Sequence, residues 1–165
     1  MRGTAGDMAR AYRHFVLRRQ SLSAQSRKPY VFYNTWAWQE RNRWWHGANY
    51  LDSMNQERIL AEIDVAHRMG IDVFVLDTGW YGRTGDWQVN LSRFPDGLKA
   101  VREKLASCGM KLGLWFSPNL AAMSSGALRG HAGCRMSWRG ELHRPHPVWE
   151  TEESTAMCLA SPYAD

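Results

Sequence analysis

One uninterrupted apolar stretch restricts the folds open to this chain more than any other feature. Residues 73–76 read Val-Phe-Val-Leu, with no polar residue among them. Such a run is typical of a strand that is buried on both faces, as in a parallel sheet. Gly70, just before it, can end a preceding helix. The sequence therefore predicts a helix followed by a parallel strand.

A carboxylate follows this predicted strand directly. Asp77 and Thr78 stand where the strand ends, ahead of Gly79 and two aromatic residues. Sheets of the α/β class bind ligands at the carboxyl ends of their strands, so Asp77 is a candidate binding residue. An Asp at this position can equally cap a loop or a helix. The strand alone leaves both interpretations open.

Two more strands and two helices share the same pattern. We predict strands over residues 30–34, 73–76 and 110–116, and helices over 55–69 and 98–107. The apolar faces of the two helices comprise Ile59, Ile63, Ala66 and Met69 in the first, and Leu98, Val101, Leu105 and Cys108 in the second. Strands alternating with helices favour parallel βαβ units with right-handed crossovers. A spacing of about forty residues per unit suits a (β/α)8 TIM barrel with enlarged loops.

Three segments lie outside this alternation. Residues 7–20 have the spacing of an amphipathic helix with an Arg-rich polar face, followed by a polar linker at 21–28. A basic helix of this kind could lie on a membrane surface or bind a calmodulin-like protein, but we expect it to pack against neighbouring structure. Residues 39–51 and the weakly periodic residues 120–165 are predicted to be long loops, with no fourth strand.

Composition argues against several classes of protein. Charged residues interrupt every apolar run, so no transmembrane span is predicted. No apolar segment follows the N-terminal arginines, so no secretory signal is visible and a cytoplasmic location is favoured. The net charge of +5 comes from scattered Arg residues with acidic residues among them, which favours a solvated surface over nucleic-acid binding. No oligomeric state is indicated.

The cysteines and histidines give no sign of a metal or cofactor. Cys108, Cys134 and Cys158 form no C-x-x-C pair, and we expect them to be free thiols. The histidines near Cys134 match no standard zinc spacing, so neither a metal nor a cofactor is expected. Nine Trp residues are a high number for 165 residues, and indole faces suit sugars, bases or cations.

Four ordered motifs carry a resemblance to a known family. They are residues 33–36 (Tyr-Asn-Thr-Trp), residues 74–82, residues 85–87 together with 94–99, and residues 109–118. In order and spacing they resemble the melibiase-type α-galactosidases, glycoside hydrolase family 36, from the first barrel strand through the third. The resemblance covers residues 8–117. It implies an α/β chain that is part of a (β/α)8 barrel, with residues 1–28 as a helix and linker entering the barrel and residues 29–165 as its N-terminal portion.

The resemblance also implies an activity, the hydrolysis of terminal α-galactosides with retention of configuration. Trp36, Asp77 and Trp115 match residues that line the family's galactose subsite, and Thr78 stands beside them as a fourth substrate-binding candidate. A carboxylate accepts charge-assisted hydrogen bonds from sugar hydroxyls, and indoles stack on the C–H face of the ring. The competing interpretation is that Trp36 and Trp115 are only core aromatics.

Two departures from the family pattern concern the sugar. Thr78 stands where the family usually has a second Asp, and Ser117 stands where it usually has a Glu. Another α-linked sugar could therefore replace galactose.

A third departure is an absence. Retaining glycosidases use a pair of carboxyl groups, which the resemblance places on the fourth and sixth strands, beyond Asp165. No catalytic residue is therefore assigned within this chain. The alternatives are a non-catalytic sugar-binding protein, and an unrelated barrel enzyme in which Asp77 is a general base.

Overall fold

The computed structural model describes residues 3–149 and 152–164. It divides the chain into two compact units, Met1–Val31 and Phe32–Asp165.

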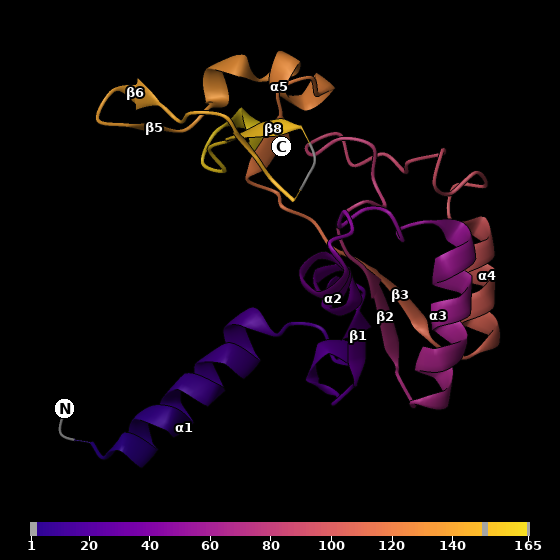
Figure 1. Cartoon of the computed structure of the whole chain (residues 1–165). Helices are drawn as coiled ribbons and strands as arrows, with labels where there is room; N and C mark the ends of the chain where they lie inside the picture. The colour runs from indigo at the N-terminus through magenta and orange to yellow at the C-terminus, as the bar shows by residue number, and fades with distance from the viewer. Residues whose placement is uncertain (1–2, 150–151, 165) are drawn as a thin grey trace. The chain divides into compact units, whose positions relative to one another are not determined.

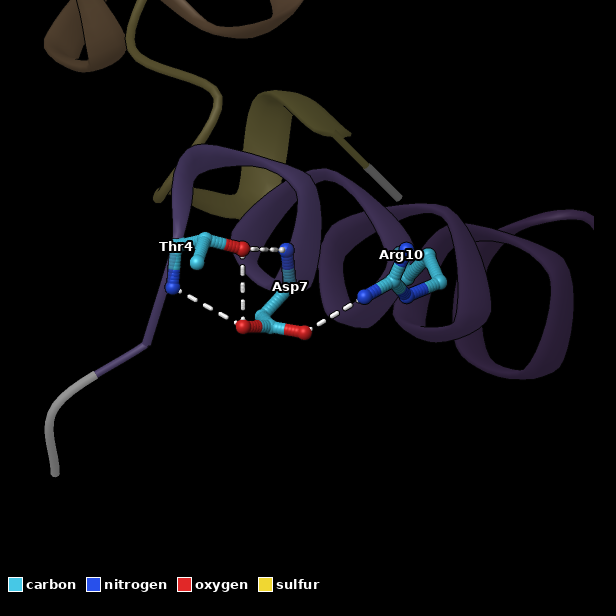
Figure 2. Close-up of polar contacts among 3 residues, drawn as sticks. All are labelled: Thr4, Asp7 and Arg10. Atoms are coloured by element: carbon cyan, nitrogen blue, oxygen red, sulfur yellow. Dashed lines mark hydrogen bonds and ion pairs between the residues drawn. The ribbon is translucent and has the colours of Figure 1, made fainter.

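The first unit contains helix α1 (Ala5–Phe15), which begins at a capping box. The Asp7 backbone N–H donates to Thr4 Oγ1 at 3.2 Å, and the Thr4 backbone N–H donates to Asp7 Oδ2 at 2.8 Å (Figure 2). Arg10 donates to the other oxygen of the same carboxylate. These bonds lower the pKa of Asp7, those from Thr4 most of all.

The helical backbone continues beyond α1 as a π-helical turn, Val16–Gln20. The predicted helix over residues 7–20 is therefore confirmed, with an earlier start. The following segment, predicted to be a linker, contains a 3-10 turn at Gln25–Arg27. Met8, Tyr12 and Phe15 are exposed within the described structure.

A three-stranded parallel sheet forms the centre of the second unit. Its strands are β1 (Phe32–Asn34), β2 (Val73–Leu76) and β3 (Lys111–Leu114), in the order β1-β2-β3. Helices α3 (Gln56–Arg68) and α4 (Lys99–Ser107) connect the strands and lie side by side against the sheet (Figure 1). These strands and helices confirm the predicted alternation, and the parallel pairing confirms the predicted βαβ units.

The core lies between this sheet and the two helices. Its buried side chains include Phe74 and Leu76 of β2, Ile59, Ile63 and Ala66 of α3, and Val101 and Leu105 of α4. Met69 was predicted to belong to this core, but that prediction is wrong because its side chain is 65% exposed. It follows the last turn of α3, where the chain turns away at Gly70 with a left-handed φ of 73°.

The opposite face of the sheet is only partly covered within the described chain. Val73 and Val75 are half-buried, and Phe32 is 58% exposed. The prediction that β2 is buried on both faces therefore holds for one face only, since the described chain provides two crossover helices and both pack on the other side.

The prediction of a loop at residues 39–51 is wrong, because most of this segment lies in helix α2 (Trp36–His46). Helix α2 contains Ala37, Gln39, Glu40 and two Arg residues, which are good helix formers. Gly47 ends the helix in a left-handed conformation, and its N–H bonds to the Arg43 carbonyl at 3.1 Å. The sequence did not predict this helix because its Trp residues do not form one apolar stripe. Only Trp38 and Gln39 of α2 are buried.

The prediction of a long loop at residues 120–165, after β3, is also wrong. An antiparallel sheet joins β4 (Leu120–Ala122), β8 (Glu153–Ala156) and β7 (His146–Pro147), while β5 (Ser137–Trp138) and β6 (Glu141–Leu142) form a hairpin. A short helix, α5 (Gly126–Gly130), and 3-10 turns at Ala132–Cys134 and Pro162–Ala164 complete the segment. These strands are too short and too polar to show alternation in the sequence. None of the helices in the described residues is long and apolar enough to cross a membrane.

Candidate functional site

A small cavity of about 150 Å³ lies at the carboxyl end of the parallel sheet. Its lining consists of Trp36, Asp77, Trp115 and Trp149. The first three were predicted from sequence to bind a sugar, so the structure brings them together at one site. They come from segments that follow three different strands.

Strand register places the segments that carry these three residues side by side. Asn34, Val75 and Gly113 are paired across the sheet, so their side-chain positions share one face. Asp77 and Trp115 follow as the next residues on that face after β2 and β3, because side chains alternate. Trp36 reaches the cavity differently, as the first residue of helix α2 directly after β1. Gly113 leaves room here, since a Cβ on it would lie 2.8 Å from Val75 Cγ2.

The Asp77 carboxylate is held in a fixed orientation. Its Oδ2 accepts a hydrogen bond from Asn34 Nδ2 at 2.8 Å, and its Oδ1 accepts one from the Thr78 backbone N–H at 2.7 Å. Asp77 is only 6% exposed. Burial raises the pKa of Asp77, and this effect outweighs the two hydrogen bonds that lower it. Each carboxylate oxygen retains a lone pair that can accept a further hydrogen bond.

A buried network of hydrogen bonds holds the backbone of Asp77 in place. The Asp77 backbone N–H donates to Thr35 Oγ1 at 2.9 Å, and the Thr35 hydroxyl donates to Gln39 Oε1 at 3.1 Å. The Gln39 amide then donates to the carbonyls of Tyr50 and Thr78, both at 3.0 Å. Thr35 and Gln39 are fully buried. The network thus ties α2 to the loops that follow α2 and β2.

The indoles around the cavity are also fixed by neighbours. The Trp36 ring stacks on Tyr50 with centroids 4.9 Å apart and planes at 15°. The Trp115 carbonyl accepts a hydrogen bond from Trp80 Nε1 at 2.9 Å, which anchors the backbone after β3. Trp36 and Trp115 are half-buried, and Trp115 also packs against the main hydrophobic core, so it combines a core contact with its place in the cavity lining.

Thr78 lies outside the lining of this cavity, in contrast to the other three candidates. It is fully buried, and its hydroxyl shares a hydrogen bond of 2.9 Å with the Tyr81 hydroxyl. Ser117 is likewise buried. Both residues therefore lie next to the cavity-forming segments without facing the cavity.

Trp149 is the lining residue that sequence reasoning missed. It precedes β8 by a few residues, within a segment that was predicted to be a loop. Its ring packs edge to face against Trp115 at 4.7 Å and against Trp36 at 6.4 Å. No local pattern marks it, so the only available signal was the high Trp content of the whole chain.

The interpretation of Asp77 as a general base in an unrelated barrel requires a second titratable group at another strand end. The hydrogen bonds that the structure gives to the carboxylate come from an amide side chain and a backbone N–H, neither of which titrates. The structure therefore gives this interpretation no support. Among the residues described, His, Cys, Asp and Glu form no group of three that could hold a metal ion.

Comparison with known proteins decides the family. The sequence pattern of the family described as Melibiase matches residues 3–149. The chain belongs to the melibiase family. The resemblance of the four motifs is thereby confirmed.

Curated relatives of this melibiase chain include bacterial α-galactosidases. Alpha-galactosidase 1 of Pediococcus pentosaceus is 29% identical over 84% of the chain and 18% of its own length. Alpha-galactosidase AgaA of Geobacillus stearothermophilus is 32% identical over 66% of the chain and 13% of its own length. The chain thus spans less than a fifth of the length of these relatives.

Solved structures give the same family. The crystal structure of the α-galactosidase from Lactobacillus brevis shares 29% identity with the melibiase chain, at a TM-score of 0.60, over 82% of this chain and 17% of that one. A variant of AgaA from Geobacillus stearothermophilus in complex with stachyose has a TM-score of 0.66 over 94% of the chain and 20% of its own, at 24% identity. The α/β fold is therefore that of family 36 α-galactosidases over this portion.

The Gln39 network predicts the effect of one substitution. Gln39→Leu should destabilise the melibiase chain by about 1–3 kcal/mol for each of the two carbonyls left without a donor. Urea unfolding of the purified protein measures the change. Gln88→Leu is the matched control, because Gln88 is exposed and its loss should change the free energy of unfolding by less than about 0.5 kcal/mol. Equal effects of the two variants would contradict the role given to Gln39.

The raised pKa of Asp77 predicts a pH dependence of stability. The folded state holds this proton more tightly than the unfolded chain does, so the stabilising contribution is complete below the unfolded pKa of about 3.9. It is lost as the pH rises through the folded pKa. The free energy of unfolding of the wild type minus that of Asp77→Asn should therefore fall with rising pH above about 4. A difference that rises with pH would show that hydrogen bonding outweighs burial.

Proposed function

We propose that this chain is the N-terminal portion of the catalytic barrel of a retaining glycoside hydrolase that acts on terminal α-galactosides. The observation that carries the proposal is the cavity formed by one fixed carboxylate and three indoles at the strand ends. Its position at the carboxyl end of parallel strands is where barrel enzymes bind substrate. Membership of the melibiase family and α-galactosidase relatives support the same activity.

The sheet supports the proposal of a larger barrel. The hydrogen-bonding edges of β1 and β3 and the partly exposed face of β2 would be covered by further strands. A (β/α)8 barrel takes about 250 residues, more than residues 29–165 provide. We assign residues 1–28 to the helix and linker entering the barrel and residues 29–165 to its first portion. The catalytic carboxylate pair then lies beyond Asp165.

The chemistry of the cavity suits a neutral sugar. The remaining lone pairs of Asp77 can accept hydrogen bonds from adjacent hydroxyls, and such charge-assisted bonds are the strong ones. Trp36 and Trp115 offer faces for the C–H side of a pyranose ring. Similar structures were solved in complex with raffinose and with stachyose, which both carry a terminal α-galactose.

Thr78 has a supporting role in this proposal. Its hydroxyl is occupied by Tyr81, so it positions the segment after Asp77 rather than contacting the sugar. Thr78 and Ser117 stand where the family usually has acidic residues, and the smaller number of charges beside the cavity favours tolerance of α-linked sugars other than galactose. The alternative is a non-catalytic sugar-binding protein, which would use the same cavity without turnover.

The barrel proposal predicts the size of the native protein. Intact-mass measurement from the source cell should give a product several times larger than the 19.0 kDa of this chain, because the chain covers less than a fifth of its relatives. A native product of 19.0 kDa would contradict the barrel and favour the binding alternative.

The assignment of Asp77 predicts a loss of activity in the full-length protein. Asp77→Ala should lower kcat/KM for p-nitrophenyl α-galactoside at least about a hundredfold, because two charge-assisted hydrogen bonds are removed. Glu141→Ala, in the exposed β5–β6 hairpin, is the control and should leave the rate unchanged. Unchanged kinetics for Asp77→Ala would reject the site. Sugar binding without turnover in the wild type would support the binding alternative.

A further inference from the structure

Trp149 touches both of the other indoles in the cavity. Its ring centroid lies 4.7 Å from that of Trp115, with planes at 89°, and 6.4 Å from that of Trp36, with planes at 79°. It is therefore a common neighbour of the two rings that we assign to the sugar. A perpendicular contact of this kind is the favoured geometry for aromatic pairs.

The small antiparallel sheet positions Trp149 beside the cavity. Trp149 follows β7, whose neighbour Val148 is buried, and it precedes β8. Its backbone has a left-handed φ of 48°, which a large side chain adopts only when its surroundings hold it there. The contacts with Trp36 and Trp115 are the surroundings that the structure shows.

Because the cavity is small, the loss of Trp149 would change its shape strongly. A space of about 150 Å³ is smaller than the 300–1,000 Å³ typical of sites for drug-sized ligands, so each of its three indole walls makes up a large part of its lining. Removing one of its indole walls would enlarge that space and leave Trp36 and Trp115 without their shared support.

We propose that Trp149 is a specificity-determining residue that closes the sugar cavity and sets the separation of Trp36 and Trp115. This inference rests on the proposed function and adds a role for the segment after β3. The antiparallel sheet then serves as a wall of the sugar site, carrying Trp149 on the connection between β7 and β8.

Steady-state kinetics of the full-length protein test this role. Trp149→Ala should raise KM for p-nitrophenyl α-galactoside at least about tenfold with a smaller change in kcat, because binding contacts are lost while the reacting groups stay in place. Trp149→Phe should raise KM only a few-fold, since it keeps an aromatic face. Trp138→Ala is the matched control, because Trp138 is 77% exposed in the β5–β6 hairpin, and it should behave as wild type.

A second variant guards against a failure to fold. Trp149→Leu fills part of the space without an aromatic face, and its KM should rise as in Trp149→Ala. A KM equal to that of Trp138→Ala, in either the Ala or the Leu variant, overturns the inference.

Calorimetric titration with galactose separates this inference from the proposed function. If the wild type binds galactose without turnover, the hydrolase proposal fails, and weaker binding by Trp149→Leu still supports the role of Trp149. If the wild type neither cleaves the galactoside nor binds galactose, both proposals are overturned.

Discussion

The side-chain amide of Gln39 is the contact on which the rest of the site depends. It is fully buried and bridges two loop carbonyls, and its oxygen accepts the Thr35 hydroxyl, which in turn holds the Asp77 backbone. A buried amide is stabilising only when its donors and acceptor are satisfied, and here they are. Because the network starts in helix α2, the helix positions the carboxylate although it contributes only Trp36 to the cavity.

Burial of Asp77 makes its carboxylate a poorly hydrated hydrogen-bond acceptor, and it also disfavours the charged form of the group. Few water molecules reach a carboxylate that is 6% exposed, so a hydrogen-bond donor that enters the cavity meets an acceptor that is already partly dehydrated. The two hydrogen bonds from Asn34 and Thr78 offset part of the burial and fix the orientation of the group. Binding sites are often the places where a fold retains such an unfavourable charge.

The βαβ core and the position of Asp77 could be predicted from the sequence because they follow from local rules, whereas Trp36 and Trp115 were expected at the site from the resemblance to the melibiase family. The apolar run at 73–76, the helix faces and the glycine stops are visible in a short window, and Asp77 stands where such a strand ends. Helix α2 was missed because its buried residues form no stripe. Trp149 was missed because its position depends on strands β7 and β8, whose pairing joins residues with no local signature. The exposure of Met69 depends on the turn at Gly70, which helical periodicity alone does not reveal.

The strict alternation of side chains along β2 has a consequence for how this chain can change over evolutionary time. Val73, Val75 and Asp77 share one face, and Phe74 and Leu76 share the other. Deleting a single residue from this strand would exchange the two sets, turning the Asp77 carboxylate toward the helices and Leu76 toward the cavity. Length variation is therefore excluded from these few residues. It is far better tolerated at the exposed turn between β5 and β6, where extra residues lengthen a surface connection and leave the strand faces as they are.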